Sequence, residues 1–103
     1  MVMCYNGINN RGNAMSTEQL KSERDELLVI FMEECAEATV EAAKLIRFGS
    51  PTMGNVAKME VEVGDLMCMV QLLSEYGIIN SAEVESHSSA KRIKLKKWSN
   101  LDV

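Results

Sequence analysis

The chain has 103 residues, 47% of them hydrophobic, which is enough for one small domain with a limited core. Eight methionines, one proline and few aromatic residues favour helices over strands. The net charge of −4 argues against a general nucleic-acid binder, so no nucleic-acid partner is expected.

The first fifteen residues hold four asparagines and two glycines and show no apolar period. We therefore interpret residues 1–15 as a flexible N-terminal extension and residues 16–103 as a single all-α domain. Ser16, with Gln19 three positions later, matches a capping box and predicts the start of the first helix.

Three helices are predicted in that domain. Residues 17–48 lack glycine and proline, and apolar residues recur there at three- and four-residue steps until Gly49 and Pro51 end the helix. A second helix is expected at residues 55–76; Gly64 inside it either allows a close approach or is simply tolerated, and Gly77 ends it. Ser81 is the expected cap of a third helix at residues 82–98, whose apolar face is thinner.

The apolar faces of three such helices are not expected to form a well-packed core in one short chain. We expect antiparallel helices that complete a four-helix-bundle core by oligomerisation, as a homodimer or homotetramer. The longest apolar run, Leu27 to Met32, is too short to span a bilayer, so no membrane partner is expected. Three cysteines without a CxxC pair indicate reduced thiols of a cytoplasmic protein, with Cys35 and Cys68 packed as small apolar residues.

Two groups of carboxylates interrupt the apolar pattern. Glu33, Glu34 and Glu37 lie in the first helix, and Glu62 and Asp65 lie in the second. Acids three apart share a helix face, and an antiparallel return can bring the two groups together. Such carboxylates would repel unless a cation lies between them, and Mg²⁺ or Mn²⁺ prefers oxygen ligands. Spacing alone leaves two readings open: a metal site that binds phosphates, or two solvated acidic faces.

The segments EECAE at 33–37 and EVGD at 62–65 resemble the EExxE and ExxD motifs of all-α nucleoside triphosphate pyrophosphohydrolases. That group includes MazG-like proteins, phosphoribosyl-ATP pyrophosphohydrolases and dimeric dUTPases. KLIRFG at 44–49 and KLKKWSN at 94–100 resemble segments of small phage and bacterial MazG-like proteins, so the likeness covers residues 17–100.

The resemblance implies Mg²⁺-dependent hydrolysis of a nucleoside triphosphate between the α and β phosphates, giving a nucleoside monophosphate and pyrophosphate. Carried over by position, it implies four metal ligands: Glu34, Glu37, Glu62 and Asp65. Glu34, with Glu37 next, is our choice for the catalytic base that accepts a proton from water. Glu33 either supports a ligand or forms a surface salt bridge. Glu41 is one turn beyond Glu37; we expect it to be solvated, with a position at the border of the site as the alternative.

A polyphosphate also needs positive donors. Lys91 and Lys94 are the first choices in the third helix, and Lys44 and Arg47 are further candidates at the end of the first. Solvated basic faces remain the alternative. Trp98 is interpreted as a packing anchor, with base stacking as the alternative, and the single histidine, His87, is expected to be exposed.

Two other functions stay open. Phosphoribosyl-ATP hydrolysis would use the same motifs, and a non-catalytic helical interaction module would use the acids to bind a basic partner. A di-iron carboxylate bundle is disfavoured, since it needs two Glu-x-x-His pairs and the chain has none.

Overall fold

The computed structural model describes residues 22–48 and 53–103. This part of the chain forms three α-helices and no strand: α2 at Glu23–Arg47, α3 at Met53–Glu75 and α4 at Ser81–Trp98. The all-α prediction is therefore confirmed. The predicted extension at 1–15, the capping box at Ser16 and the helix stop at Gly49 and Pro51 lie outside the described residues.

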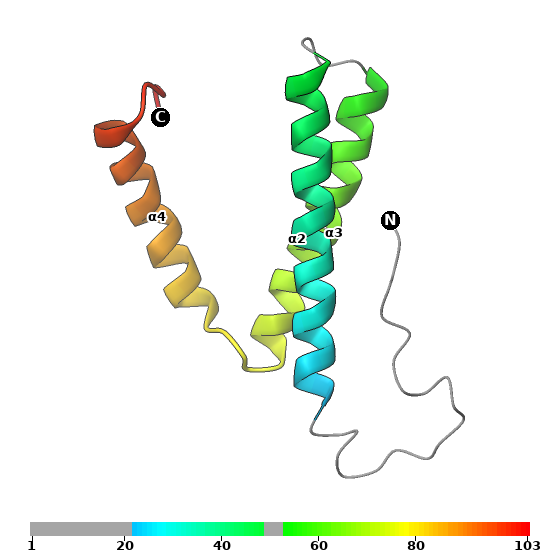
Figure 1. Ribbon diagram of the computed structural model, residues 1–103. Coiled ribbons are helices and arrows are strands. Elements are labelled where there is room, and N and C mark those ends of the chain that lie inside the picture. Colours follow the sequence, from blue (N-terminus) through cyan, green and yellow to red (C-terminus); the bar gives the residue numbers. More distant parts are fainter. Residues whose placement is uncertain (1–21, 49–52) are drawn as a thin grey trace.

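Helices α2 and α3 form an antiparallel pair (Figure 1). The ends of α2 suit its dipole, because three acids occupy the first turn while Lys44 and Arg47 occupy the last. A hydrogen bond between Tyr76 and Glu23 joins the segment after α3 to the start of α2. This hydrogen bond raises the pKa of Tyr76, and the charge of Glu23 raises it further. The pairing is what brings the two acidic groups together.

The apolar core of this pair is small. Met69 and Leu73 of α3 are the only buried hydrophobic residues among those described, at 6% and 3% exposed. Large apolar side chains remain open to solvent, among them Met67 at 66%. Cys35 is half-buried but Cys68 is exposed, so the prediction that Cys68 packs in the core is wrong. Within the described residues, the apolar faces of the helices are therefore only partly buried.

The turn between α3 and α4 is built around Gly77. Its φ of 72° lies in the left-handed region, and its N–H donates to the Ser74 carbonyl at 3.0 Å, which ends α3. The cap of α4 is Asn80, whose side-chain oxygen accepts a hydrogen bond from the Glu83 N–H at 3.1 Å. Ser81 is therefore the first helical residue and not the predicted cap, because Asn80 has the extended backbone that a cap requires.

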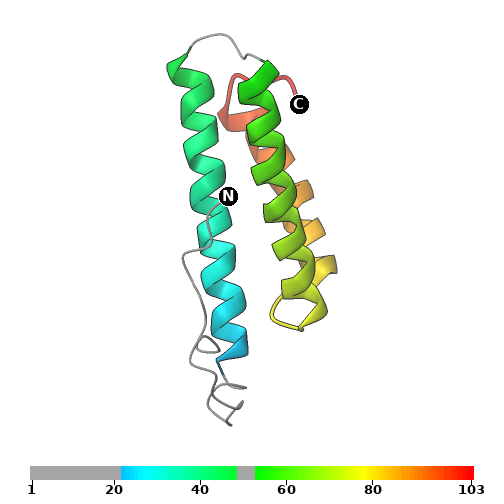
Figure 2. The same cartoon turned by 90° about the vertical axis from the view of Figure 1, so that its right-hand side faces the viewer.

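After this turn, α4 runs in the direction opposite to α3 and stands away from the α2–α3 pair (Figures 1 and 2). None of its residues is buried. The described chain is thus a two-helix core with an open third helix. No helix in the described ranges joins enough length to enough apolar character to cross a bilayer.

Candidate metal centre

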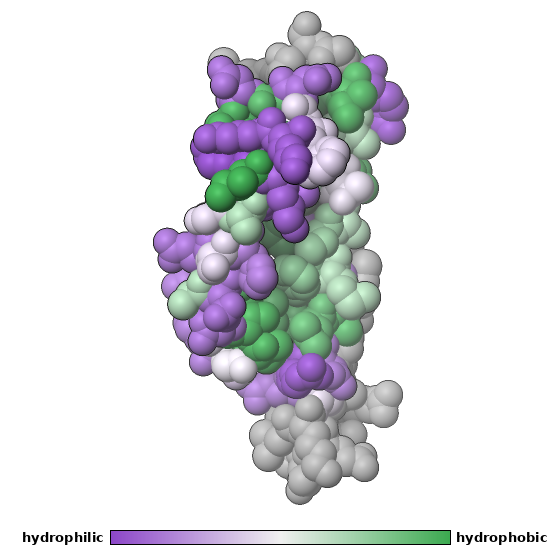
Figure 3. All heavy atoms as spheres, turned by 90° about the vertical axis from the view of Figure 1, so that its left-hand side faces the viewer, coloured by the Kyte–Doolittle hydropathy of each residue, from purple (hydrophilic) through white to green (hydrophobic). Residues whose placement is uncertain are grey.

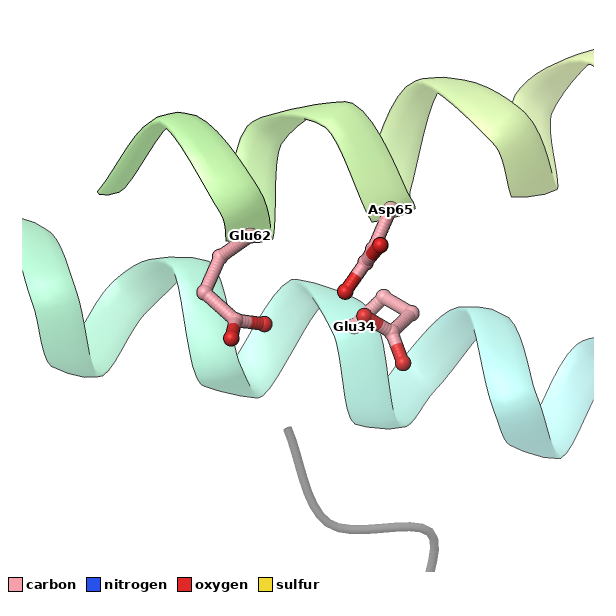
Figure 4. A group of neighbouring side chains, drawn as sticks. All are labelled: Glu34, Glu62 and Asp65. Atoms are coloured by element: carbon pink, nitrogen blue, oxygen red, sulfur yellow. The ribbon is translucent and has the colours of Figure 1, made fainter. Parts of the chain in front are cut away.

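Three carboxylates meet where α2 faces α3. Glu34 projects from α2, while Glu62 and Asp65 project toward it from α3 (Figure 4). One oxygen from each of the three lies within 4.8 Å of the others. Glu62 and Asp65 both point to the same side of α3, because residues three apart in a helix share a face. The predicted convergence of the two acidic groups is therefore present in the fold.

Burial makes the position of Glu34 costly. Glu34 is 2% exposed, Glu62 is 5% exposed and Asp65 is half-buried. Both carboxylate oxygens of Glu34 are buried, and no described group donates a hydrogen bond to either. A buried carboxylate with no donor and no cation is strongly unfavourable, so buried acids normally have a partner.

Charge repulsion adds to that cost. Burial raises the pKa of Glu34 above 4.5, and the charges of Asp65, Glu62, Glu37 and Glu33 raise it further, in that order. Two full charges 4.8 Å apart repel by about 3.5 kcal/mol at an effective dielectric constant of 20. No described lysine or arginine forms an ion pair with Glu34 or Asp65 to offset this. The cluster therefore favours either protonation or a bound cation.

The donor set fits a hard divalent cation. All three donors are carboxylates, which Mg²⁺, Mn²⁺ and Ca²⁺ accept as ligands, and no histidine or cysteine takes part. Two oxygens on opposite sides of Mg²⁺ are about 4.2 Å apart, so a spread of up to 4.8 Å needs only small side-chain movements to close on the ion. The cluster of Glu34, Glu62 and Asp65 can hold a metal ion.

The fourth predicted ligand, Glu37, is not among these three. It is half-buried, and its charge is close enough to help raise the pKa of Glu34. Glu33 is also half-buried and contributes in the same direction. The structure thus gathers three of the four predicted ligands, with Glu37 beside them.

Glu41 differs from its prediction. We expected a solvated side chain, but Glu41 is 7% exposed and its Oε2 accepts a hydrogen bond from the Lys44 ammonium at 3.2 Å. The physical reason is that Glu41 continues the three- and four-residue spacing of Glu34 and Glu37, which directs it to the side that meets α3. That spacing was the sequence signal that could have identified it.

The four cations predicted to bind phosphate are not part of the carboxylate cluster. Lys44 is engaged with Glu41, and Arg47 is exposed with its guanidinium 5.5 Å from the centre of the Phe48 ring. Lys91 and Lys94 are exposed on α4, which diverges from the pair that carries the cluster (Figure 1). Of these four cations, Lys44 contacts a buried carboxylate and the other three are exposed to solvent.

Two further residues on α4 are exposed. His87 is 82% exposed, as predicted, and its Nε2 lies 3.9 Å from a Glu83 carboxylate oxygen. Trp98 is 77% exposed, with the Lys97 ammonium 5.2 Å from its ring centre, so it anchors no packing within the described chain.

Comparison of the chain with protein-family models, with curated proteins and with solved structures found no match.

Proposed function

We propose that this protein is a Mg²⁺-dependent nucleotide pyrophosphohydrolase that converts a nucleoside triphosphate to a nucleoside monophosphate and pyrophosphate. The observation that carries the proposal is the buried cluster of Glu34, Glu62 and Asp65, in which both Glu34 oxygens lack a donor among the described residues. The sequence resemblance of the 33–37 and 62–65 motifs to all-α pyrophosphohydrolases supports the same reading.

In this proposal Glu34, Glu62 and Asp65 hold the ion, with Glu37 completing the ligand set as the motif implies. Bound Mg²⁺, or Mn²⁺ in its place, supplies positive charge for phosphate oxygens and lowers the pKa of water. Glu37 is also the better candidate for the proton acceptor, because it is half-buried and lies beside the cluster, whereas Glu34 is enclosed within it. Glu33 orients Glu34 or Glu37 from the neighbouring position.

Substrate binding needs positive charge near the cluster. Lys44 and Arg47 are on the same helix as Glu34, and we propose that they contact phosphate or the rest of the nucleotide when substrate is present. Lys91 and Lys94 contribute only if α4 of the same or another chain comes to the cluster. We further propose that the protein is cytoplasmic. We also propose that it self-associates as a homodimer or homotetramer, because few of its described apolar residues are buried.

The decisive activity test is pyrophosphate release from a panel of ribonucleoside and deoxyribonucleoside triphosphates and phosphoribosyl-ATP, with Mg²⁺ or with EDTA. Glu37→Gln and Asp65→Asn should lower kcat/KM by at least about 100-fold, since each removes a group that acts on the reacting centre. Glu60→Gln is the matched control, because Glu60 is an exposed acid on the same helix as Asp65.

Each outcome of the panel has a definite meaning. Mg²⁺-dependent turnover of a nucleoside triphosphate, lost in the cluster variants and kept in Glu60→Gln, is the expected result. Turnover of phosphoribosyl-ATP alone would replace the proposed substrate class. No turnover of any nucleotide would contradict the enzyme and favour a helical interaction module.

A further inference from the structure

Helix α4 packs only slightly against the rest of the described chain. All of its residues are exposed except Leu95, which is only partly covered. An isolated helix of 18 residues is marginal in water, because nucleation is unfavourable and most helices in proteins are stabilised by tertiary packing. Four serines in its first half lower its intrinsic helix propensity further. A contact with another molecule would supply the tertiary packing that stabilises this helix.

A groove of about 500 Å³ lies between the end of α3 and the first half of α4. Val70, Ile79 and Val84 give it an apolar lining, and Glu75 and Glu85 add two negative charges. Figure 3 shows hydrophobic surface in the lower half of this face, next to the hydrophilic side chains of α4. The groove therefore suits a segment that carries both apolar side chains and positive charge.

The second half of α4 has that chemistry. One side of the helix bears residues spaced by three and four in turn, the pattern of a two-helix seam: Ser81, Val84, Ser88, Lys91, Leu95 and Trp98. The first three of these residues line the groove, so this side faces it. The last two are the large apolar residues of the seam, and five lysines and arginines surround them.

The charges of α4 are self-complementary in an antiparallel pair. Its acids, Glu83 and Glu85, are in the first half, and all its lysines and arginines are in the second. If two copies of α4 align end to end in opposite directions, Val84 lies opposite Leu95 of the second copy, and Ser81 lies opposite Trp98. Glu85 and Arg92 are seven residues, or two turns, apart and so share one edge of the seam. A two-fold axis puts Glu85 of each copy beside Arg92 of the other.

We propose that two copies of this chain associate through antiparallel α4 helices, each placing Leu95 and Trp98 in the groove between α3 and α4 of the other. Trp98 is the anchor, since buried tryptophans commonly carry much of the binding energy at interfaces. The acidic groove then meets the basic half of the partner helix. This interface rests on the proposed self-association and is independent of metal binding and hydrolysis.

A charge-swap experiment on the full chain tests the interface. Sedimentation equilibrium should show a wild-type dimer, and Glu85→Lys and Arg92→Glu should each raise its dissociation constant by about tenfold or more, because like charges then meet at two symmetric contacts. Combining both substitutions in one chain, or mixing the two single variants, should restore dimers. Trp98→Ala should weaken association by a similar or larger factor.

Controls separate this interface from a general charge effect. Glu83→Lys changes the same charge two residues away but outside the groove lining, and should shift the dissociation constant less than threefold. Circular dichroism should show that every variant keeps its helix content. Dimers unaffected by Glu85→Lys and Trp98→Ala would overturn the interface while leaving self-association standing. A monomeric wild type would overturn both the interface and the self-association, and neither result would bear on hydrolysis.

Discussion

Among the described side chains, Glu34 is the most informative. Its carboxylate is almost fully enclosed, has two acidic neighbours within 4.8 Å and receives no hydrogen bond from the described chain. Structural acids are normally placed where water or donors satisfy them. A helix pair that keeps this group in its interface gives up stability there, which is the usual sign of a site retained for binding or catalysis.

The raised pKa of Glu34 gives a pH-dependent stability difference. The folded protein holds this proton more tightly than the unfolded chain, so the contribution is fully present below about pH 4.5 and is lost as the pH rises through the higher folded pKa. Without metal, Glu34→Gln should therefore unfold at a higher temperature than wild type at pH 7. The gap should narrow as the pH falls to 4.5, and a gap that does not change with pH would contradict the assignment.

Lys44 is expected to be structural as well as functional. Lys44→Ala would leave the buried Glu41 without its cation, which should lower the free energy of unfolding by about 1–3 kcal/mol. Lys58→Ala is the matched control, because Lys58 is exposed on α3 and should change stability by no more than about 0.5 kcal/mol. Urea unfolding of both variants measures the difference, and equal values would show that the ion pair contributes nothing.

At the element scale, the sequence predicted the helices well and their packing only in part. The three- and four-residue spacing identified α2 and α3, and the convergence of Glu34, Glu62 and Asp65 followed from their antiparallel return. The burial of Glu41 was not predicted, because a charged side chain is expected in solvent even where its spacing places it on the buried face. The place of α4 could not be predicted, since its apolar face is thin and nothing in its pattern selects a neighbour within the chain.

Two glycines should respond in opposite ways to alanine. Neither Gly77 nor Gly64 has an atom within 4 Å of an added Cβ, so backbone conformation alone separates them. Gly77→Ala should cost about 1–2 kcal/mol because of its φ of 72°. Gly64→Ala, inside α3, should stabilise by about 0.5–1 kcal/mol. Thermal unfolding checks both, and destabilisation by Gly64→Ala would indicate a close approach that a single chain does not contain.

In the molecule as a whole, the α2–α3 pair and helix α4 are expected to bind different partners: a metal ion and a second chain. The α2–α3 pair carries the cluster but buries few apolar residues, and α4 buries none. An association of two chains would cover α4 and the groove, and it would also bring a second set of lysines and arginines into the assembly. Metal binding within the pair and association through α4 can therefore be tested separately.

Metal should stabilise the protein through the cluster. A ligand that binds only the folded state at 100 times its dissociation constant adds about 2.7 kcal/mol, which for a domain of this size corresponds to an increase of roughly 10–20 °C in Tm. Mg²⁺ should produce a shift of this kind in wild type and in Glu60→Gln, and little or none in Glu34→Gln. Equal shifts in all three proteins would indicate metal binding elsewhere.

The proposed activity depends on a divalent cation held by Glu34, Glu62 and Asp65 between α2 and α3. The most direct measurement is titration of the full chain with Mn²⁺, followed by electron paramagnetic resonance of the free ion, with Mg²⁺ added in competition. Saturable Mn²⁺ binding that Mg²⁺ displaces is the expected result. Asp65→Asn should weaken this binding at least about tenfold, and Glu60→Gln should leave it unchanged. Binding of equal strength in wild type and Asp65→Asn, or no saturable binding at all, would contradict the proposed metal site.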